Sequence, residues 1–123
     1  MLRSQQIACQ SLTGIQEASQ RDGKFQQRYA TLVNRLPIMI RESGLVASLG
    51  FLEGKRGNDE NTPEGMLLQH LSQQMEVNDL RQQALNAELT EYRHLTQKVM
   101  EALVWYKRIA ESHLDQEGNT HAD

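Results

Sequence analysis

Glu91 and His94 are the clearest pair of residues that could do chemistry, because they stand three positions apart. On a helix this Glu-x-x-His spacing places a carboxylate and an imidazole side by side, as in the di-iron sites of helical bundles. Such a site needs a second Glu-x-x-His and two more inward-facing glutamates, and the sequence contains no second copy of the motif. Both residues also point away from the apolar stripe of their own helix. We therefore interpret the pair as a chance spacing.

The other side chains that could act as nucleophiles or metal ligands are isolated. His70, His113 and His121 lack the spacing of metal ligands, and the single cysteine, Cys9, has no partner for a disulfide or a zinc site. We expect Cys9 to be a small buried side chain of the first helix. The sequence contains neither a G-x-S-x-G elbow nor a phosphate-binding P-loop. We predict that the chain is not an enzyme and binds no cofactor and no metal.

Basic residues are concentrated in the first part of the chain. Residues 1–56 contain eight Lys and Arg against four Asp and Glu, a net +4, whereas residues 57–123 contain five against twelve, a net −7. On a helix, Lys24, Arg28 and Arg35 fall within about 40° of one another beside the apolar stripe, and we call these three residues the basic ridge. Such a ridge can bind phosphate groups, or it can be a solvated flank whose aliphatic stems cover apolar neighbours. Because the ridge flanks the stripe, we expect it to be dispensable for folding.

Two residues, Pro37 and Gly44, interrupt the most apolar stretch of the chain. Pro37 lacks a backbone N–H and disfavours the helical conformation of Leu36, so we expect the helix that arrives from Lys24 to end or kink there. Gly44 stands where a left-handed residue would end the next segment. The two residues are therefore predicted to bracket a separate short helix, and the apolar run that follows must pack on longer helices.

Apolar residues at spacings of three and four predict further helices on both sides of this stretch. The first spans about residues 2–19 and is followed by a break at 21–23. After a polar loop over 55–62, Thr62 as N-cap and Pro63 at the first helical position begin another helix. The following segment, up to Ala84, fits either a loop or a helical turn.

The last helix is predicted to be the longest, over about residues 86–114, with Leu89 and Tyr92 on its buried stripe. Trp105 lies off that stripe, as part of a second core layer or as an anchor for a partner. The prediction is an all-α, compact single-domain bundle of about five to six helices over 1–114, with a polar, disordered tail over 115–123. The sequence shows neither a long apolar segment nor a signal-like start. We therefore expect a soluble cytoplasmic protein that does not enter membranes.

Three stretches of the sequence resemble a known family. The run from Tyr29 onward reads Y-x-x-L-V-x-x-L-P-x-M-I-x-x-x-G-L-x-x-x-L-x-F-L, and the long helix contains Y-x-x-L-T from Tyr92 and W-Y-K-R-I-A from Trp105. Together they are similar to the small α-helical subunit of the type III-B CRISPR effector, the Cmr complex of the RAMP module. Ile109 stands where the family usually has an aromatic residue, and the net charge of −3 is also a departure from the family pattern.

The resemblance implies a non-catalytic component of RNA-guided antiviral defence. Members of the family stack as a short filament beside the backbone subunits, along the groove where guide RNA pairs with target RNA, while other subunits cleave. The implied partners are other Cmr subunits, copies of the chain itself, guide RNA and target RNA. The candidate nucleic-acid-binding residues are Lys24, Arg28, Arg35, Arg41, Lys107 and Arg108.

Two other hypotheses remain open from the sequence. The first is a helical adaptor that binds only protein, with a basic ridge that is merely solvated. The second, a metal-dependent bundle enzyme built on Glu91 and His94, is much weaker. The salt dependence of binding separates the leading hypothesis from the adaptor, because phosphate contacts weaken as salt is added.

Overall fold

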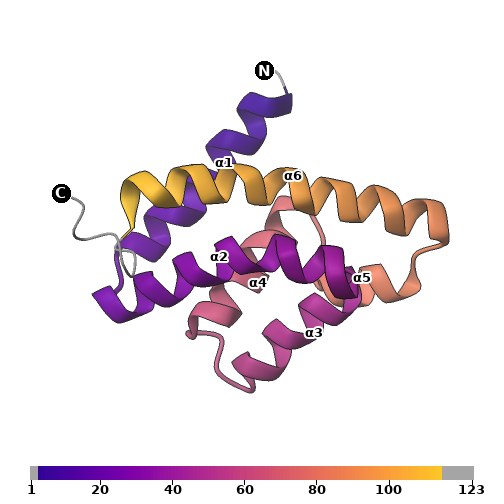
Figure 1. The fold of residues 1–123 in the computed structure, drawn as a ribbon, viewed down its shortest axis with the longest axis horizontal. Coiled ribbons are helices and arrows are strands. Elements are labelled where there is room, and N and C mark those ends of the chain that lie inside the picture. Colours follow the sequence, from indigo (N-terminus) through magenta and orange to yellow (C-terminus); the bar gives the residue numbers. More distant parts are fainter. Residues whose placement is uncertain (1–2, 115–123) are drawn as a thin grey trace.

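The computed structural model describes residues 3–114, and all of its regular elements over that range are helices. They are α1 Arg3–Ser19, α2 Gly23–Ser43, α3 Leu45–Arg56, α4 Pro63–Gln74, α5 Leu80–Asn86 and α6 Leu89–His113. The predicted all-α bundle with a long C-terminal helix is confirmed (Figure 1). The predicted tail over 115–123 lies outside the described residues. Within those described, each helix is too short or too polar to serve as a membrane span.

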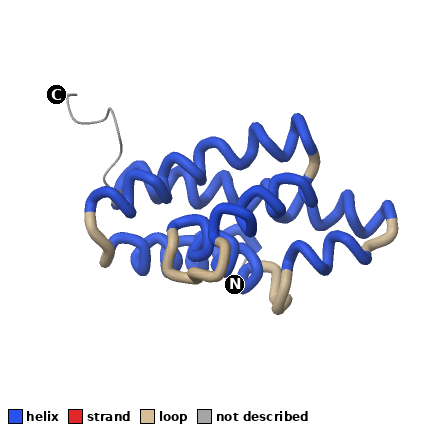
Figure 2. The backbone as a smooth tube through the Cα atoms, turned by 90° about the horizontal axis from the view of Figure 1, so that it is seen from below, coloured by secondary structure: helices blue, strands red, loops and turns tan. Residues whose placement is uncertain are grey.

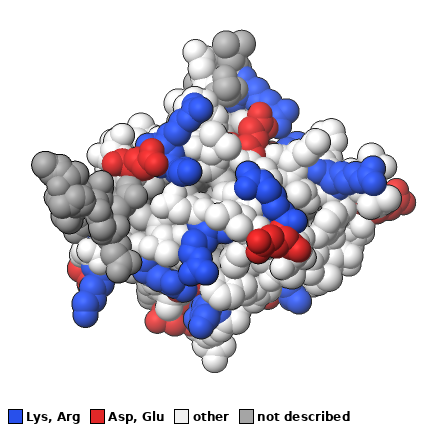
Figure 3. Space-filling view, viewed as in Figure 1, with Lys and Arg blue, Asp and Glu red and all other residues white. Residues whose placement is uncertain are grey.

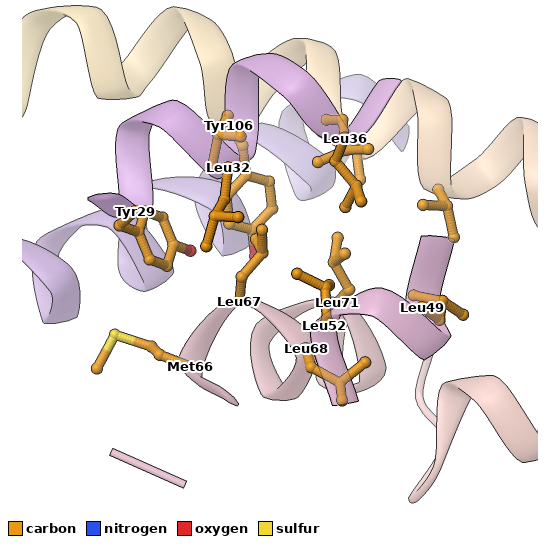
Figure 4. Close-up of a cluster of buried hydrophobic side chains, with 14 of the residues drawn as sticks. Tyr29, Leu32, Leu36, Leu49, Leu52, Met66, Leu67, Leu68, Leu71 and Tyr106 are labelled. Atoms are coloured by element: carbon orange, nitrogen blue, oxygen red, sulfur yellow. The ribbon is translucent and has the colours of Figure 1, made fainter. Parts of the chain in front are cut away.

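Helix α2 lies at the centre of the arrangement and packs against α1, α3, α4 and α6. Figure 1 shows α6 antiparallel beside α2. Helix α1 crosses α6 at a steep angle. The tube in Figure 2 shows that short loops join most of the helices. In the core, Leu32 and Leu36 of α2 face Leu67 and Leu71 of α4, with Tyr106 of α6 beside them (Figure 4). The α2 stripe predicted from apolar spacing is therefore the one that the bundle buries.

The prediction that Pro37 ends the helix is wrong. Helix α2 continues through Pro37 to Ser43, so Pro37 and Gly44 do not bracket a separate short helix. A proline inside a helix removes one backbone hydrogen bond and crowds the preceding turn. Leu36 and Ile40, before and after Pro37, are both buried in the core. Their burial offsets the local cost, because most helix stability in proteins comes from packing of the apolar face.

Gly44 ends α2 as predicted and turns the chain into α3. Its φ of 91° is positive, although its ψ of 166° is extended rather than left-handed helical, and its N–H donates to the Ile40 carbonyl over 2.8 Å. Gly44 offers no side chain to cap α3. The Tyr92 hydroxyl of α6 accepts a hydrogen bond from the Val46 N–H over 3.1 Å and takes that role. The start of α3 is thus held by a residue 46 positions away in the sequence.

Other boundaries differ from the predictions by a few residues. Gly23 belongs to α2, and Asp22 caps that helix by accepting from the Phe25 N–H over 2.9 Å, so the break lies before Gly23. Helix α3 extends to Arg56, which shortens the loop to residues 57–62. Thr62 caps α4 through the Gly65 N–H and Pro63 is its first residue, as predicted.

Two side-chain predictions also need correction. Cys9 is exposed, because it falls about 120° around α1 from the fully buried Ile15. Leu89 is 66% exposed, since the start of α6 extends past the end of α2 (Figure 1). Trp105, for which the sequence left both a second core layer and a partner anchor open, is half-buried, and the Arg108 guanidinium lies 5.4 Å from its ring centroid.

A buried polar chain links α1, α2 and α4. His70, only 4% exposed, places Nε2 2.8 Å from Oε1 of Glu17 and Nδ1 2.7 Å from the Tyr29 hydroxyl. Because a carboxylate can only accept, Nε2 carries the hydrogen, and Nδ1 accepts from the Tyr29 O–H. A second proton on His70 would occupy Nδ1, so the Tyr29 hydroxyl could no longer donate to it. Burial lowers the pKa of His70, although the Glu17 carboxylate opposes this effect.

Gly44→Val should destabilise the protein by about 2–3 kcal/mol, because the conformation at Gly44 is almost exclusive to glycine. A Cβ there would also lie 3.3 Å from the Tyr92 hydroxyl. Gly54→Val is the matched control, since a Cβ at Gly54 meets nothing within 4 Å and its backbone is helical. Chemical denaturation of the three proteins measures the difference. Equal stability of the Gly44 variant and wild type would show that this glycine is ordinary.

The free energy of unfolding should fall as the pH drops from about 7 to about 5, because His70 has a lowered pKa. Below the ordinary histidine pKa of about 6.5 the unfolded chain binds a proton that the folded chain resists, so stability is lost at up to about 1.4 kcal/mol per pH unit. His70→Gln should flatten this dependence. The exposed His94, replaced by Gln, is the control and should leave the slope unchanged. Identical slopes for wild type and His70→Gln would refute the assignment.

Candidate nucleic-acid interface

The basic ridge lines a shallow groove on the outer side of α2. Lys24, Arg28 and Arg35 surround a concavity of about 360 Å³, together with Gln27 and Thr31. All five residues come from α2, because positions four and seven apart return to the same side of a helix. The structure therefore brings the three ridge residues together around one space, as their spacing predicted. The concavity is open to solvent and is not enclosed.

Arg28 makes a contact that the sequence did not reveal. Its Nε lies 2.8 Å from Oε2 of Glu64, in the first turn of α4. The Glu64 side chain is only 9% exposed, whereas that of Arg28 is 39% exposed. The partial positive charge at the N-terminus of α4 also favours a carboxylate at this position. The sequence places Glu64 at a helix start, but nothing in it shows which cation Glu64 meets.

Gly65 explains how Glu64 comes to be buried. A Cβ at Gly65 would lie 2.9 Å from the Glu60 carbonyl oxygen, closer than real Cβ atoms approach backbone. The absence of a side chain therefore lets the loop over 57–62 pack directly on the first turn of α4. This close contact helps to exclude water from that turn, where Glu64, Gly65 and Met66 are all buried.

The ion pair gives Arg28 a different role from its neighbours. Removing Arg28 alone would leave the buried Glu64 carboxylate without its partner, at a cost of about 1–3 kcal/mol for a pair intermediate between buried and exposed. We therefore expect Arg28, unlike Lys24 and Arg35, to contribute to stability. Over residues 3–114, neither Lys24 nor Arg35 lies within ion-pair distance of an acid. Their charges are the uncompensated ones in the groove.

The other three candidate cations lie outside the groove. Arg41 is exposed in the last turn of α2, about 120° around the helix from the ridge. Lys107 and Arg108 are exposed on α6, and Arg108 stacks on Trp105. Figure 3 shows Lys and Arg side chains spread over the face that α2 and α6 form, with acidic side chains among them. The concentrated feature is thus the groove, and the remaining cations are dispersed.

The Glu91 and His94 pair has a structural explanation. Glu91 accepts a hydrogen bond from the Glu88 N–H over 3.2 Å and completes the capping box of α6. Both Glu91 and His94 are exposed. In the part of the chain that the structure describes, no group of three His, Cys, Asp or Glu side chains is placed to hold a metal ion. Glu91 therefore has a role in helix capping, and His94 takes no part in it.

Comparison with known proteins identifies the family. The family model described as CRISPR-associated protein (Cas_Cmr5) matches residues 3–113. A protein of Thermus thermophilus named CRISPR system Cmr subunit Cmr5 is 30% identical over 114 residues, which cover 93% of this chain and 97% of that protein. These matches confirm the resemblance drawn from the sequence motifs.

A solved structure agrees with this relationship. The crystal structure of a CRISPR-associated Cmr5 family protein, also from Thermus thermophilus, superposes with a TM-score of 0.79 at 28% identity, covering 93% of this chain and 99% of that one. The helical arrangement around α2 and the sequence motifs thus lead to the same conclusion. The chain belongs to the Cmr5 family of CRISPR-associated proteins.

Proposed function

We propose that the chain is a non-catalytic small subunit of a type III-B CRISPR RNA-guided effector, the Cmr complex, and that it contacts the RNA backbone through the basic ridge. The observation that supports the RNA contact is the groove on α2, where Lys24 and Arg35 stand on either side of Arg28 and, among residues 3–114, make no ion pair. Membership in the Cmr5 family supports the assignment to the complex. Contacts to phosphate are independent of sequence, which suits a subunit of a complex that reads sequence by base pairing.

Assembly of several copies compensates for the small number of cations in one copy. The chain has a net charge of −3, so a single copy offers only a local basic surface on an acidic protein. Copies stacked as a filament along guide and target RNA would present their grooves repeatedly to one strand. Linked weak contacts of this kind add up to strong binding. The cytoplasm, where such complexes meet foreign RNA, is the proposed place of action.

An adaptor that contacts only protein is the second candidate, and one observation favours it. Within residues 3–114, four large apolar side chains are substantially exposed: Ile38, Leu85, Leu89 and Val104. Apolar side chains on a surface are common at protein interfaces. In a filament these residues would meet neighbouring subunits, so the two candidates differ only in whether the basic ridge touches RNA.

Replacing Lys24 and Arg35 together by alanine should weaken the hold of the reconstituted complex on target RNA and leave the fold intact. Arg28 is kept, because its loss would expose the buried carboxylate of Glu64. Each lost phosphate contact should reduce the slope of log affinity against log salt by roughly 0.7–0.9 per copy. Titration of target RNA at several salt concentrations measures both the affinity and its dependence on salt.

The matched control is the pair Arg93→Ala and Lys98→Ala, which removes two exposed cations of α6 outside the groove. It changes the net charge by the same amount and should leave affinity and salt slope close to wild type. If the Lys24 and Arg35 variant is fully incorporated and binds RNA like wild type, the ridge is a solvated flank and the adaptor function is correct. An equal loss in the control would mean that overall charge matters and the groove does not.

A further inference from the structure

Arg28 is held in a way that leaves most of its hydrogen-bonding capacity unused. A guanidinium carries five N–H groups, one on Nε and four on the two terminal nitrogens. The contact with Glu64 uses Nε. Among residues 3–114 the terminal nitrogens have no hydrogen bond or ion pair, and the side chain lines the groove between Lys24 and Arg35. The guanidinium is therefore held through Nε, while its two terminal nitrogens remain available to a ligand in the groove.

We propose that Glu64 is a positioning residue that holds Arg28 so that its terminal nitrogens bind one RNA phosphate in the groove. This inference rests on the proposed function and adds a mechanism to it. Lys24 and Arg35 then attract the RNA strand through long-range electrostatics. Arg28 makes a bidentate hydrogen-bonded contact with one phosphate at a fixed place. A guanidinium suits this task because its planar fork matches a phosphate with two parallel hydrogen bonds.

Burial of Glu64 is what makes the arrangement useful. An exposed arginine loses much side-chain freedom when it binds, which weakens the interaction. Arg28 is already ordered by a carboxylate that is itself held in the first turn of α4. The ion pair also cancels one charge, so Arg28 adds little to non-specific attraction. The resulting contact depends on geometry more than on net charge, and this gives a direct way to test it.

Arg28→Lys separates the positioning role from a simple charge. A lysine at this position reaches about as far as the guanidinium carbon, so its single ammonium group should pair with Glu64 and end short of the groove. The ion pair and the thermal midpoint should remain close to wild type. Binding of a matching single-stranded target RNA by the reconstituted complex should weaken roughly tenfold or more, with a smaller salt slope. Binding equal to wild type would overturn the proposal.

A second variant tests whether Glu64 is responsible. In Glu64→Gln with Arg28 unchanged, a neutral amide replaces the carboxylate that holds the guanidinium, and the chain becomes one charge more positive. Affinity for target RNA should fall despite the added positive charge, because the guanidinium is no longer held firmly at one place. Affinity equal to or above that of wild type, in a variant with a wild-type thermal midpoint, would show that Glu64 does not position Arg28.

The Lys24 and Arg35 double variant, measured in the same titrations, distinguishes failure of this inference from failure of the proposed function. If that variant weakens RNA binding and Arg28→Lys does not, the groove binds RNA and the positioning role is wrong. If neither variant changes binding, the groove does not contact RNA. Both the RNA contact of the basic ridge and the positioning role of Glu64 are then wrong. The proposal requires that both weaken binding while both proteins stay folded and incorporated.

Discussion

Burial of one face of α2 is the constraint on which the rest of the structure depends. This helix packs against α1, α3, α4 and α6, and its buried side chains from Tyr29 to Ile40 lie in the core that α4 and α6 share with it. Once that face is fixed inward, the residues beside it have a fixed direction as well. Lys24, Arg28 and Arg35 must then line one side of the helix next to α4. The location of the candidate interface is therefore a consequence of core packing.

Much of this arrangement follows from local sequence signals. Apolar spacing predicted the buried stripe of α2, Gly44 predicted its end, and Thr62 with Pro63 predicted the start of α4, because each signal acts within a few residues. Pro37 shows where local reasoning fails, since packing of the helix on both sides outweighs one missing hydrogen bond. A helix boundary inferred from one residue depends on how strongly its neighbours are buried.

The interactions that could not be predicted join residues far apart in the chain. Glu64 pairs with Arg28 across 36 positions, and His70 reaches Tyr29 and Glu17 across 41 and 53. A sequence shows which side chains could take part in such contacts, but the partner is chosen by how the helices pack. This limit matters for function, because the three basic residues of the ridge look equivalent in sequence. Over the part of the chain that the structure describes, Arg28 pairs with a buried carboxylate, whereas Lys24 and Arg35 make no ion pair.

Photo-crosslinking would show whether RNA runs across the groove of α2. Target RNA carrying 4-thiouridine would be bound by the reconstituted complex, irradiated, and the crosslinked peptides identified by mass spectrometry. If RNA runs across the groove, we expect crosslinks to this chain within residues 24–35, the segment that lines the groove. A fully assembled complex whose crosslinks to this chain are absent, or confined to α6, would contradict it.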